Sequence, residues 1–277
     1  MTAMSQPALA SPSNPRIKAA ARLRDRRERD ATGLTLVDGA RELRRALDAG
    51  VAVVEAFVCE PLLAGADARA VLDALRRRDV PITTTTEPAF AKLAFGDRSE
   101  GLVAVVRAPS LALQDLVVPA EPLIVVIEGV EKPGNVGAVL RSADGAGVDA
   151  VIAASPRTDL ANPNVIRASA GTIFSVPMAA APTAEVRRWL VDQRIRIVAA
   201  RVDGAIDYTA VDLTGAVAIV VGSEAEGLTG AWSGADVVTI RLPMLGVADS
   251  LNVSVSAAIL AYEARRQRDG QQPTEAD

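Results

Sequence analysis

One stretch of the chain, residues 128–141, places an amide, small residues and a cation close together. Asn135 can cap a helix, Gly137 permits close packing, and Arg141 follows on the same predicted helix. The stretch contains neither Gly-x-Gly-x-x-Gly nor Gly-Lys-[Ser/Thr], so the dinucleotide and phosphate-loop fingerprints are absent. Taken alone, a capped helix with a surface arginine is the simpler interpretation.

Two further polar turns follow. Residues 222–227 read Gly-Ser-Glu-Ala-Glu-Gly and include Glu224, and a plain connection between a strand and a helix would explain them equally well. In residues 242–256, Ser250, Asn252 and further serines alternate with Leu and Val where a helix is predicted to begin. Polar groups this dense beside an apolar segment indicate hydrogen bonds to something other than solvent.

These turns follow predicted strands of one α/β domain, residues 123–268. The apolar run at 123–127 is typical of a strand buried on both faces of a parallel sheet. Ligands of open α/β sheets bind at the carboxyl ends of such strands, where the three turns are expected. The periodicity predicts strands at 123–127, 150–154, 195–200, 216–221 and 237–242, and helices at 135–146, 165–170, 183–193 and 250–268.

A smaller α/β domain is predicted before it, over residues 15–107. The proline-rich segment 108–122 is predicted to be a linker, residues 1–14 to be disordered, and residues 269–277 to be a loose tail. The pattern predicts strands at 34–37, 53–59, 80–84 and 102–107, and helices at 39–49, 66–78 and 87–94.

The composition excludes several kinds of site. The chain has no histidine, which excludes Ser-His-Asp hydrolysis and histidine-ligated metals. Cys59 is the single cysteine, so an intramolecular disulfide is impossible, and its apolar surroundings predict a buried side chain. No apolar stretch is long enough for a membrane span and the N-terminus lacks the features of a signal peptide, so a cytoplasmic protein is expected.

Positive charge is concentrated near the N-terminus of a chain whose net charge is −4. Residues 1–110 hold 17 Lys and Arg against 14 Asp and Glu, whereas residues 111–277 hold 13 against 20. The basic residues crowd into one predicted helical stretch, which is compatible with nucleic-acid binding but also with a solvated helix. The candidate RNA-binding residues in it are Arg22, Arg24, Arg26, Arg27 and Arg29.

Together, the three turns resemble the three motifs of the SpoU (TrmH-like) family of RNA 2′-O-ribose methyltransferases, in the same order and spacing. The stretches GNVGAVLRSADGAG and LPMLGVADSLNVSVSAAILAYEARRQR carry the resemblance, which spans residues 123–268. Residues 17–106 are similar, more loosely, to the family's N-terminal substrate-binding domain, whose fold resembles ribosomal protein L30e.

The resemblance implies a fold, a cofactor and partners. The fold would be an L30e-like domain followed by an α/β-knot domain, whose mostly parallel sheet is closed by a trefoil knot that periodicity alone cannot indicate. The donor would be S-adenosyl-L-methionine, with no metal, and the protein would be a homodimer. RNA is the implied substrate, ribosomal RNA being favoured over transfer RNA. A non-catalytic RNA-binding protein is the alternative, and a nicotinamide-dependent oxidoreductase lacks its glycine fingerprint.

The resemblance also assigns site residues. The implied cofactor pocket is lined by backbone at Ala199, Ala200, Arg201, Gly222, Leu242 and Leu251. The bulky Arg201 is expected to contribute only its backbone. The implied catalytic residues are Arg141, Asn135, Glu224, Ser250 and Asn252. Because a guanidinium stays protonated, Arg141 is better suited to gripping phosphate and orienting the 2′-hydroxyl than to acting as a base.

Overall fold

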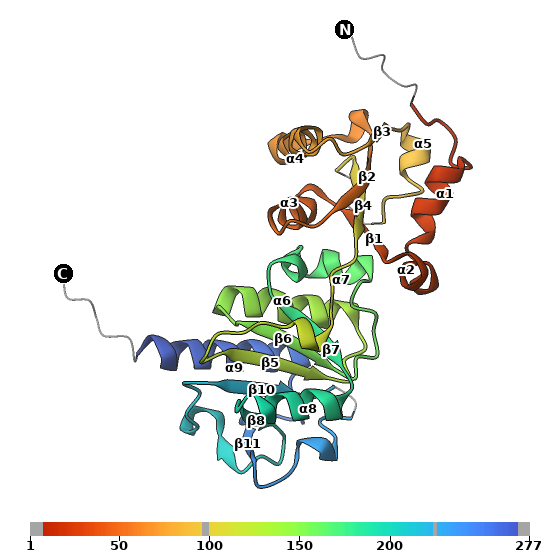
Figure 1. Cartoon of the computed structure of the whole chain (residues 1–277). Helices are drawn as coiled ribbons and strands as arrows, with labels where there is room; N and C mark the ends of the chain where they lie inside the picture. The colour runs from red at the N-terminus through yellow and green to blue at the C-terminus, as the bar shows by residue number, and fades with distance from the viewer. Residues whose placement is uncertain (1–7, 96–99, 224–225, 271–277) are drawn as a thin grey trace, which may run out of the picture. The chain divides into compact units, whose positions relative to one another are not determined.

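A computed structural model of the chain describes residues 8–95, 100–223 and 226–270, which form two compact units (Figure 1). The N-terminal unit consists of the chain up to Pro109 together with Asp159–Ser175, and the C-terminal unit consists of Ser110–Thr158 and the chain from Val176 onward. The sequence-based division had placed residues 159–175 in the second domain. In the structure this segment, which includes helix α7 (Pro163–Ala168), packs within the N-terminal unit instead.

A four-stranded sheet, counted over the described residues, forms the centre of the N-terminal unit, in the order β1-β4-β2-β3. Strand β4 pairs antiparallel with β1 and β2, and β2 pairs parallel with β3. The elements are α1 (Pro15–Arg22), α2 (Arg26–Thr32), β1 (Leu34–Asp38), α3 (Ala40–Asp48), β2 (Val53–Val58), α4 (Gly65–Arg77), β3 (Ile82–Thr84), α5 (Glu87–Phe90) and β4 (Leu102–Arg107).

The N-terminal segment packs on this sheet. Ile17 and Leu23 share a core with Phe57 and with Cys59, whose predicted burial is confirmed. Residues 8–14 were expected to be disordered, but Leu9 donates its N–H to the Thr84 carbonyl over 2.8 Å, which adds the segment to the sheet edge. Residues 1–7 lie outside the described part of the chain.

The basic stretch is two helices, α1 and α2, and not the one predicted. The break lies between Arg22 and Arg26, where the Asp25 carboxylate accepts the N–H of Arg27 (3.3 Å) and so caps α2. An aspartate at this position satisfies donors that a continuing helix would have bonded internally, so the chain starts a new helix here.

The C-terminal unit is built on a seven-stranded sheet of described residues, in the order β7-β6-β5-β10-β8-β11-β9. All its strand pairs are parallel, which confirms the predicted mostly parallel α/β class. The elements are β5 (Leu123–Glu128), α6 (Pro133–Ala146), β6 (Ala150–Ala154), β7 (Met178–Ala181), α8 (Thr183–Asp192), β8 (Arg196–Ala200), β9 (Ile206–Asp207), β10 (Val217–Val221), β11 (Val237–Arg241) and α9 (Val253–Asp269).

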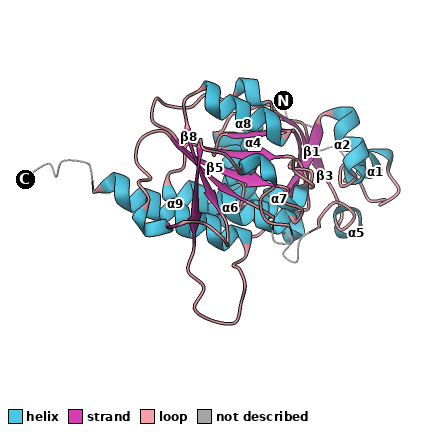
Figure 2. Cartoon of the chain, turned by 90° about the horizontal axis from the view of Figure 1, so that it is seen from below, coloured by secondary structure: helices cyan, strands magenta, loops and turns pink. Residues whose placement is uncertain are grey.

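Helices cover both faces of this sheet. Helices α6 and α9 pack side by side, while α8 lies on the opposite face (Figure 2). Alternate residues of β5 serve the two faces: Ile124 and Val126 join a core with Val186 and Leu190 of α8. Because both faces are covered, β5 is apolar throughout until its last residue, Glu128.

The predicted linker is partly docked on the C-terminal unit. Leu113 is 8% exposed and belongs to the core that α8 covers, and the Leu111 carbonyl accepts the N–H of Ala180 (2.8 Å). Strand β7, which this contact extends, was not predicted. In the described part of the chain, no helix has the length and apolar character needed to cross a membrane.

Candidate active site

The carboxyl ends of β8, β10 and β11 meet at one edge of the parallel sheet and surround a cavity of about 1080 Å³. Each strand continues into a loop that lines it. The end of β8 contributes Ala200, the loop after it contributes Arg201, and the loop after β10 contributes Gly222. The long loop after β11 contributes Leu242, Ser250 and Leu251, among others.

Gly222 has no room for a side chain. A Cβ at this position would lie 2.5 Å from the backbone nitrogen of Leu228 and even closer to the Gly227 carbonyl group. Gly227 and Leu228 therefore lie directly against Gly222 at the end of β10, and Gly227 N donates a hydrogen bond to Ser223 O (3.0 Å). The glycine keeps backbone exposed to the cavity where any other residue would displace the loop.

The loop after β8 is fixed by two arginines. Arg201 donates its backbone N–H to Ile240 O (2.8 Å), and its Nε donates to Asp203 (2.9 Å), which lowers the pKa of that carboxyl. Arg241 donates to the carbonyls of Gly204 (3.0 Å) and Ala205 (2.9 Å). Because the N–H of Arg201 is already used, this residue cannot offer its backbone donor to a ligand.

Five of the six predicted cofactor residues line the cavity. These are Ala200, Arg201, Gly222, Leu242 and Leu251. Ala199 is the exception, because it is fully buried within β8 and does not line the cavity. The family resemblance pointed to the end of this strand, but it did not indicate which of its residues face the cavity.

Asn252 connects the cavity rim to α6. It lies between Leu251 and Val253, which both line the cavity, and its Oδ1 accepts the N–H of Ser254 (2.9 Å), which caps α9. Its Nδ2 donates to Oδ1 of Asn135 over 3.3 Å. The structure thus brings together two predicted catalytic residues that are far apart in sequence, and a third, Ser250, lies on the cavity wall.

Arg141 lies on the exposed side of α6, less than two turns after Asn135. Its side chain makes no hydrogen bond or ion pair with any residue in the described ranges. Side chains of a helix lean toward its N-terminus, so the guanidinium of Arg141 can reach back toward the Asn135 end of α6. Glu224, the remaining predicted catalytic residue, lies outside the described residues.

Sequence reasoning gave no role to Glu128, a buried carboxylate (3% exposed) at the carboxyl end of β5. It accepts hydrogen bonds from the hydroxyl of Thr183 (2.9 Å) and from the N–H (2.8 Å) and hydroxyl (2.9 Å) of Thr229. Glu128 therefore ties the β5 end to the start of α8 and to the segment after the 222–227 turn. A charged residue closing an apolar strand was the signal that could have found it.

Arg157, also unpredicted, joins two other loops at this edge. It forms ion pairs with Glu131 (2.8 Å) and with Glu226, a residue of the cavity wall. These hydrogen bonds lower the pKa of Glu226 and raise that of Arg157. The groups are exposed, so the pairs contribute to loop geometry more than to stability.

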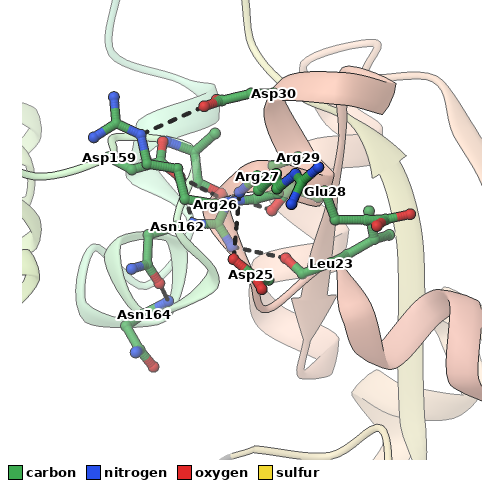
Figure 3. Close-up of polar contacts among 12 residues, drawn as sticks. Leu23, Asp25, Arg26, Arg27, Glu28, Arg29, Asp30, Asp159, Asn162 and Asn164 are labelled. Carbon is green, nitrogen blue, oxygen red and sulfur yellow. Dashed lines mark hydrogen bonds and ion pairs between the residues drawn. The ribbon is translucent and has the colours of Figure 1, made fainter.

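The predicted RNA-binding arginines differ in their surroundings, and Figure 3 shows three of them, Arg26, Arg27 and Arg29, with their polar neighbours. Arg29 is 4% exposed and donates to Asp159 (2.7 Å from Nε) and to the Leu23 carbonyl (2.8 Å), so its assignment as a phosphate contact is wrong. Arg24 donates to the carbonyls of Leu93 and Ala94. Arg22, Arg24, Arg26 and Arg27 are all exposed, so their assignment to RNA binding stays a prediction.

Comparison with known proteins places these features in a family. The model of the SpoU rRNA Methylase family matches residues 122–262, and the model named MRM3-like substrate binding domain matches residues 14–104. A relative from Xylella fastidiosa named 23S rRNA (guanosine-2′-O-)-methyltransferase RlmB is 36% identical over 222 residues, which cover 76% of this chain and 89% of the relative. This chain belongs to the SpoU rRNA methylase family.

Other SpoU proteins extend the likeness. A 23S rRNA (uridine(2479)-2′-O)-methyltransferase from Streptomyces viridochromogenes is 34% identical over 183 residues, covering 63% of this chain and 64% of the relative, slightly under two thirds of its length. A crystal structure described as an RNA 2′-O ribose methyltransferase has a TM-score of 0.84 and 43% identity, covering 94% of this chain and 99% of that chain.

A further solved structure carries the cofactor. AviRb from Streptomyces viridochromogenes, a SpoU methyltransferase crystallised with AdoMet, has a TM-score of 0.82 and 29% identity. The match covers 93% of this chain and 100% of AviRb. The resemblance seen in the sequence is thus confirmed, and it extends over both units of the chain.

Proposed function

We propose that this protein transfers a methyl group from S-adenosyl-L-methionine to a ribose 2′-hydroxyl of ribosomal RNA. The observation that carries the proposal is the convergence of all three polar turns at one edge of the sheet. Residues of the 222–227 and 242–256 turns line the cavity, and the 128–141 turn is joined to its rim by the Asn135–Asn252 hydrogen bond. Family membership supports the reaction, and the relatives named as 23S rRNA methyltransferases support the substrate class.

The cavity suits the proposed cofactor. Its volume, about 1080 Å³, lies just above the usual range for small-molecule sites, and its wall combines backbone at Gly222 with the apolar side chains of Leu242 and Leu251. A flat adenosine needs such a combination, because its ring prefers apolar contact while its nitrogens need backbone partners. When bound, S-adenosylmethionine supplies a methyl group activated by a positively charged sulfur.

The residues of this chain then have to align the acceptor hydroxyl and receive its proton. We assign Arg141 to the RNA phosphate and the 2′-hydroxyl, because a planar guanidinium can hold both while staying protonated. Ser250, on the cavity wall, and Asn252, bonded to Asn135, would position the ribose. Glu224 is proposed to accept the proton or to hold Arg141. An in-line transfer depends on such alignment more than on a strong base.

The partners and location follow from the same proposal. We infer a homodimer, which exposed apolar residues of the C-terminal unit support: Leu245 and Val247 in the loop after β11, and Val255 and Tyr262 on α9. Sedimentation analysis would detect it. We also propose that the enzyme acts in the cytoplasm, where a ribosomal RNA substrate is expected. The trefoil knot and the absence of a metal stay predictions of the family resemblance.

The proposal is tested by supplying the purified protein with methyl-labelled S-adenosylmethionine and unmodified 23S rRNA transcribed in vitro. Label should appear in the RNA, and mapping should find it on a ribose 2′-oxygen. Unfractionated transfer RNA serves as the competing substrate. Cofactor binding without label in either RNA would favour a binding protein with an inactive site, and label on a base would contradict the reaction proposed here.

A further inference from the structure

A second hollow, of about 440 Å³, lies in the N-terminal unit between α3 and α4. From α3 it is lined by Arg44 and Asp48, and from α4 and its end by Ala70, Ala74, Arg77 and Arg78 among others. Arg44 and Asp48 are one helical turn apart, as are Ala70 and Ala74, so the hollow runs between two facing ridges. Nothing in the proposed methyl-transfer site uses it.

Arg44 is the unusual residue of this hollow. Its side chain is partly buried, and its Nε is buried without a hydrogen-bond partner. Its guanidinium forms no ion pair or hydrogen bond with any residue in the described ranges. A guanidinium carries five N–H donors, and leaving a buried donor of a charged group unsatisfied is costly. The Nε itself is closed to solvent, so an acceptor that arrives from outside would meet the terminal nitrogens of Arg44, which lines the hollow.

The other charges of the hollow leave room for an anion. Among described residues Arg77 has no ion pair either, and Arg78 donates to the Leu47 carbonyl (3.3 Å). Of the two lining carboxylates, that of Asp73 already pairs with Arg76 (3.0 Å). Three guanidiniums thus face one uncompensated carboxylate, that of Asp48, which gives the hollow a positive balance.

The shape of the hollow depends on two alanines. Ala70 and Ala74 project from the same face of α4, and their short side chains leave space beside Arg44 that a longer side chain would fill. The opening admits a group with several oxygen acceptors, such as a phosphate, to the donors of Arg44 and Arg77. Arginine is well suited to such a group, because its planar fork matches two phosphate oxygens.

We propose that this hollow binds a phosphodiester group of the RNA substrate through Arg44 and Arg77. The inference rests on the proposed function, and RNA is favoured because the family model matched by this unit is a substrate-binding domain. The buried ion pair of Arg29 with Asp159 also removes one cation of the basic stretch from RNA binding. We therefore place part of the RNA-binding surface, which the sequence predicted in the basic stretch, between α3 and α4.

The test compares two double variants of the full-length protein that lose equal charge. Arg44→Gln/Arg77→Gln removes the hollow's free guanidiniums. Arg69→Gln/Arg188→Gln removes two exposed arginines that line neither cavity. Binding of 23S rRNA transcript is measured over a range of salt concentrations, and cofactor binding by calorimetry. The hollow variant should bind RNA about ten- to a hundredfold more weakly, with a salt slope smaller by roughly 1.4–1.8, while the control stays near wild type.

A third variant, Ala70→Glu, keeps both arginines and places a carboxylate in the hollow. It sits at an exposed helical position, so it should fold, and it should weaken RNA binding as the double variant does. Equal RNA affinity and salt slope in Arg44→Gln/Arg77→Gln and in the control would overturn the proposal. So would calorimetry showing a free-anion site: inorganic phosphate bound by the wild type and lost in the double variant, with RNA binding unchanged.

This inference and the proposed function fail separately. Absence of methyl transfer by the wild type would refute the function, whereas the affinity comparison examines the hollow by itself. In active protein, the hollow variant should approach the wild-type single-turnover rate when RNA is saturating, because Arg44 and Arg77 bind RNA away from the reacting atoms. A reduced rate at saturating RNA together with normal affinity would also contradict the assignment.

Discussion

Asn252 donates a hydrogen bond from Nδ2 to Oδ1 of Asn135 over 3.3 Å, joining two turns that are 117 residues apart in the chain. The same Asn252 side chain caps α9 through its Oδ1. One residue thus starts the last helix and links the cavity rim to the helix that carries Arg141. Its two functions use different atoms, so substitution can separate them.

Asn252→Asp is expected to keep the helix cap but lose the donor to Asn135. Asp and Asn are equally good caps, so the free energy of unfolding should change by less than about 0.5 kcal/mol. The single-turnover rate of methyl transfer should fall roughly ten- to a hundredfold, because the rim is no longer aligned with α6. The control is Ser254→Ala, which removes only the hydroxyl bond to Asn252 (2.6 Å). Wild-type turnover in Asn252→Asp would show that the Asn135–Asn252 hydrogen bond has only a structural role.

Arg141→Ala should fold and bind S-adenosylmethionine normally but transfer methyl groups on the order of a hundredfold more slowly, since it loses an alignment contact. Arg141→Lys keeps the charge but not the planar fork, and we expect it to restore little of the rate. Arg188→Ala, a change at another exposed helical arginine, is the control. Near-normal single-turnover rates in both Arg141 variants would show that Arg141 is a surface residue with no part in methyl transfer.

Gly222→Ala should weaken cofactor binding at least about tenfold. Its Cβ would press on the backbone at Gly227 and Leu228, so the backbone at the cavity wall must shift. Gly230→Ala is the matched control, because a Cβ there meets no atom within 4 Å. Calorimetry with S-adenosylmethionine compares the two. Equal affinities in the two variants would mean that this turn does not contact the cofactor.

Asp159→Asn tests the buried ion pair of the N-terminal unit. The asparagine Oδ1 can still accept the N–H of Ala161, as Asp159 does (2.9 Å), but the buried Arg29 charge is left uncompensated. We expect the unfolding free energy to fall by about 3–5 kcal/mol, while the salt slope of RNA binding is unchanged. The control is the exposed ion pair Arg26–Asp30 (3.5 Å). Breaking it with Arg26→Ala should lower the unfolding free energy by less than about 0.5 kcal/mol. A Tm equal to wild type in Asp159→Asn would contradict the buried-pair assignment.

Much of the C-terminal unit could be predicted because its signals are local. Strand β6 has the predicted bounds, residues 150–154, and β5 differs by one residue, since a strand buried on both faces is apolar along its length. Strand β7 was missed because three of its four residues are alanine, which has little preference for strands. Its conformation comes from pairing with β6 and from the bridge to Ala112.

In the candidate site, too, some features could be predicted from the sequence and others depended on the tertiary structure. The sequence indicated three candidate turns, because glycines, amides and serines follow apolar strands there, and the family resemblance gave these turns their proposed roles. Only the tertiary structure decided which residues meet: Asn135 with Asn252, and Glu128 with Thr229. The same holds for Arg29. Its sequence context resembles that of its exposed neighbours, but in the fold it is buried and paired with Asp159, 130 residues later. Residue type and period reflect the nearest few positions, whereas burial and pairing depend on contacts between distant segments that form only when the chain folds.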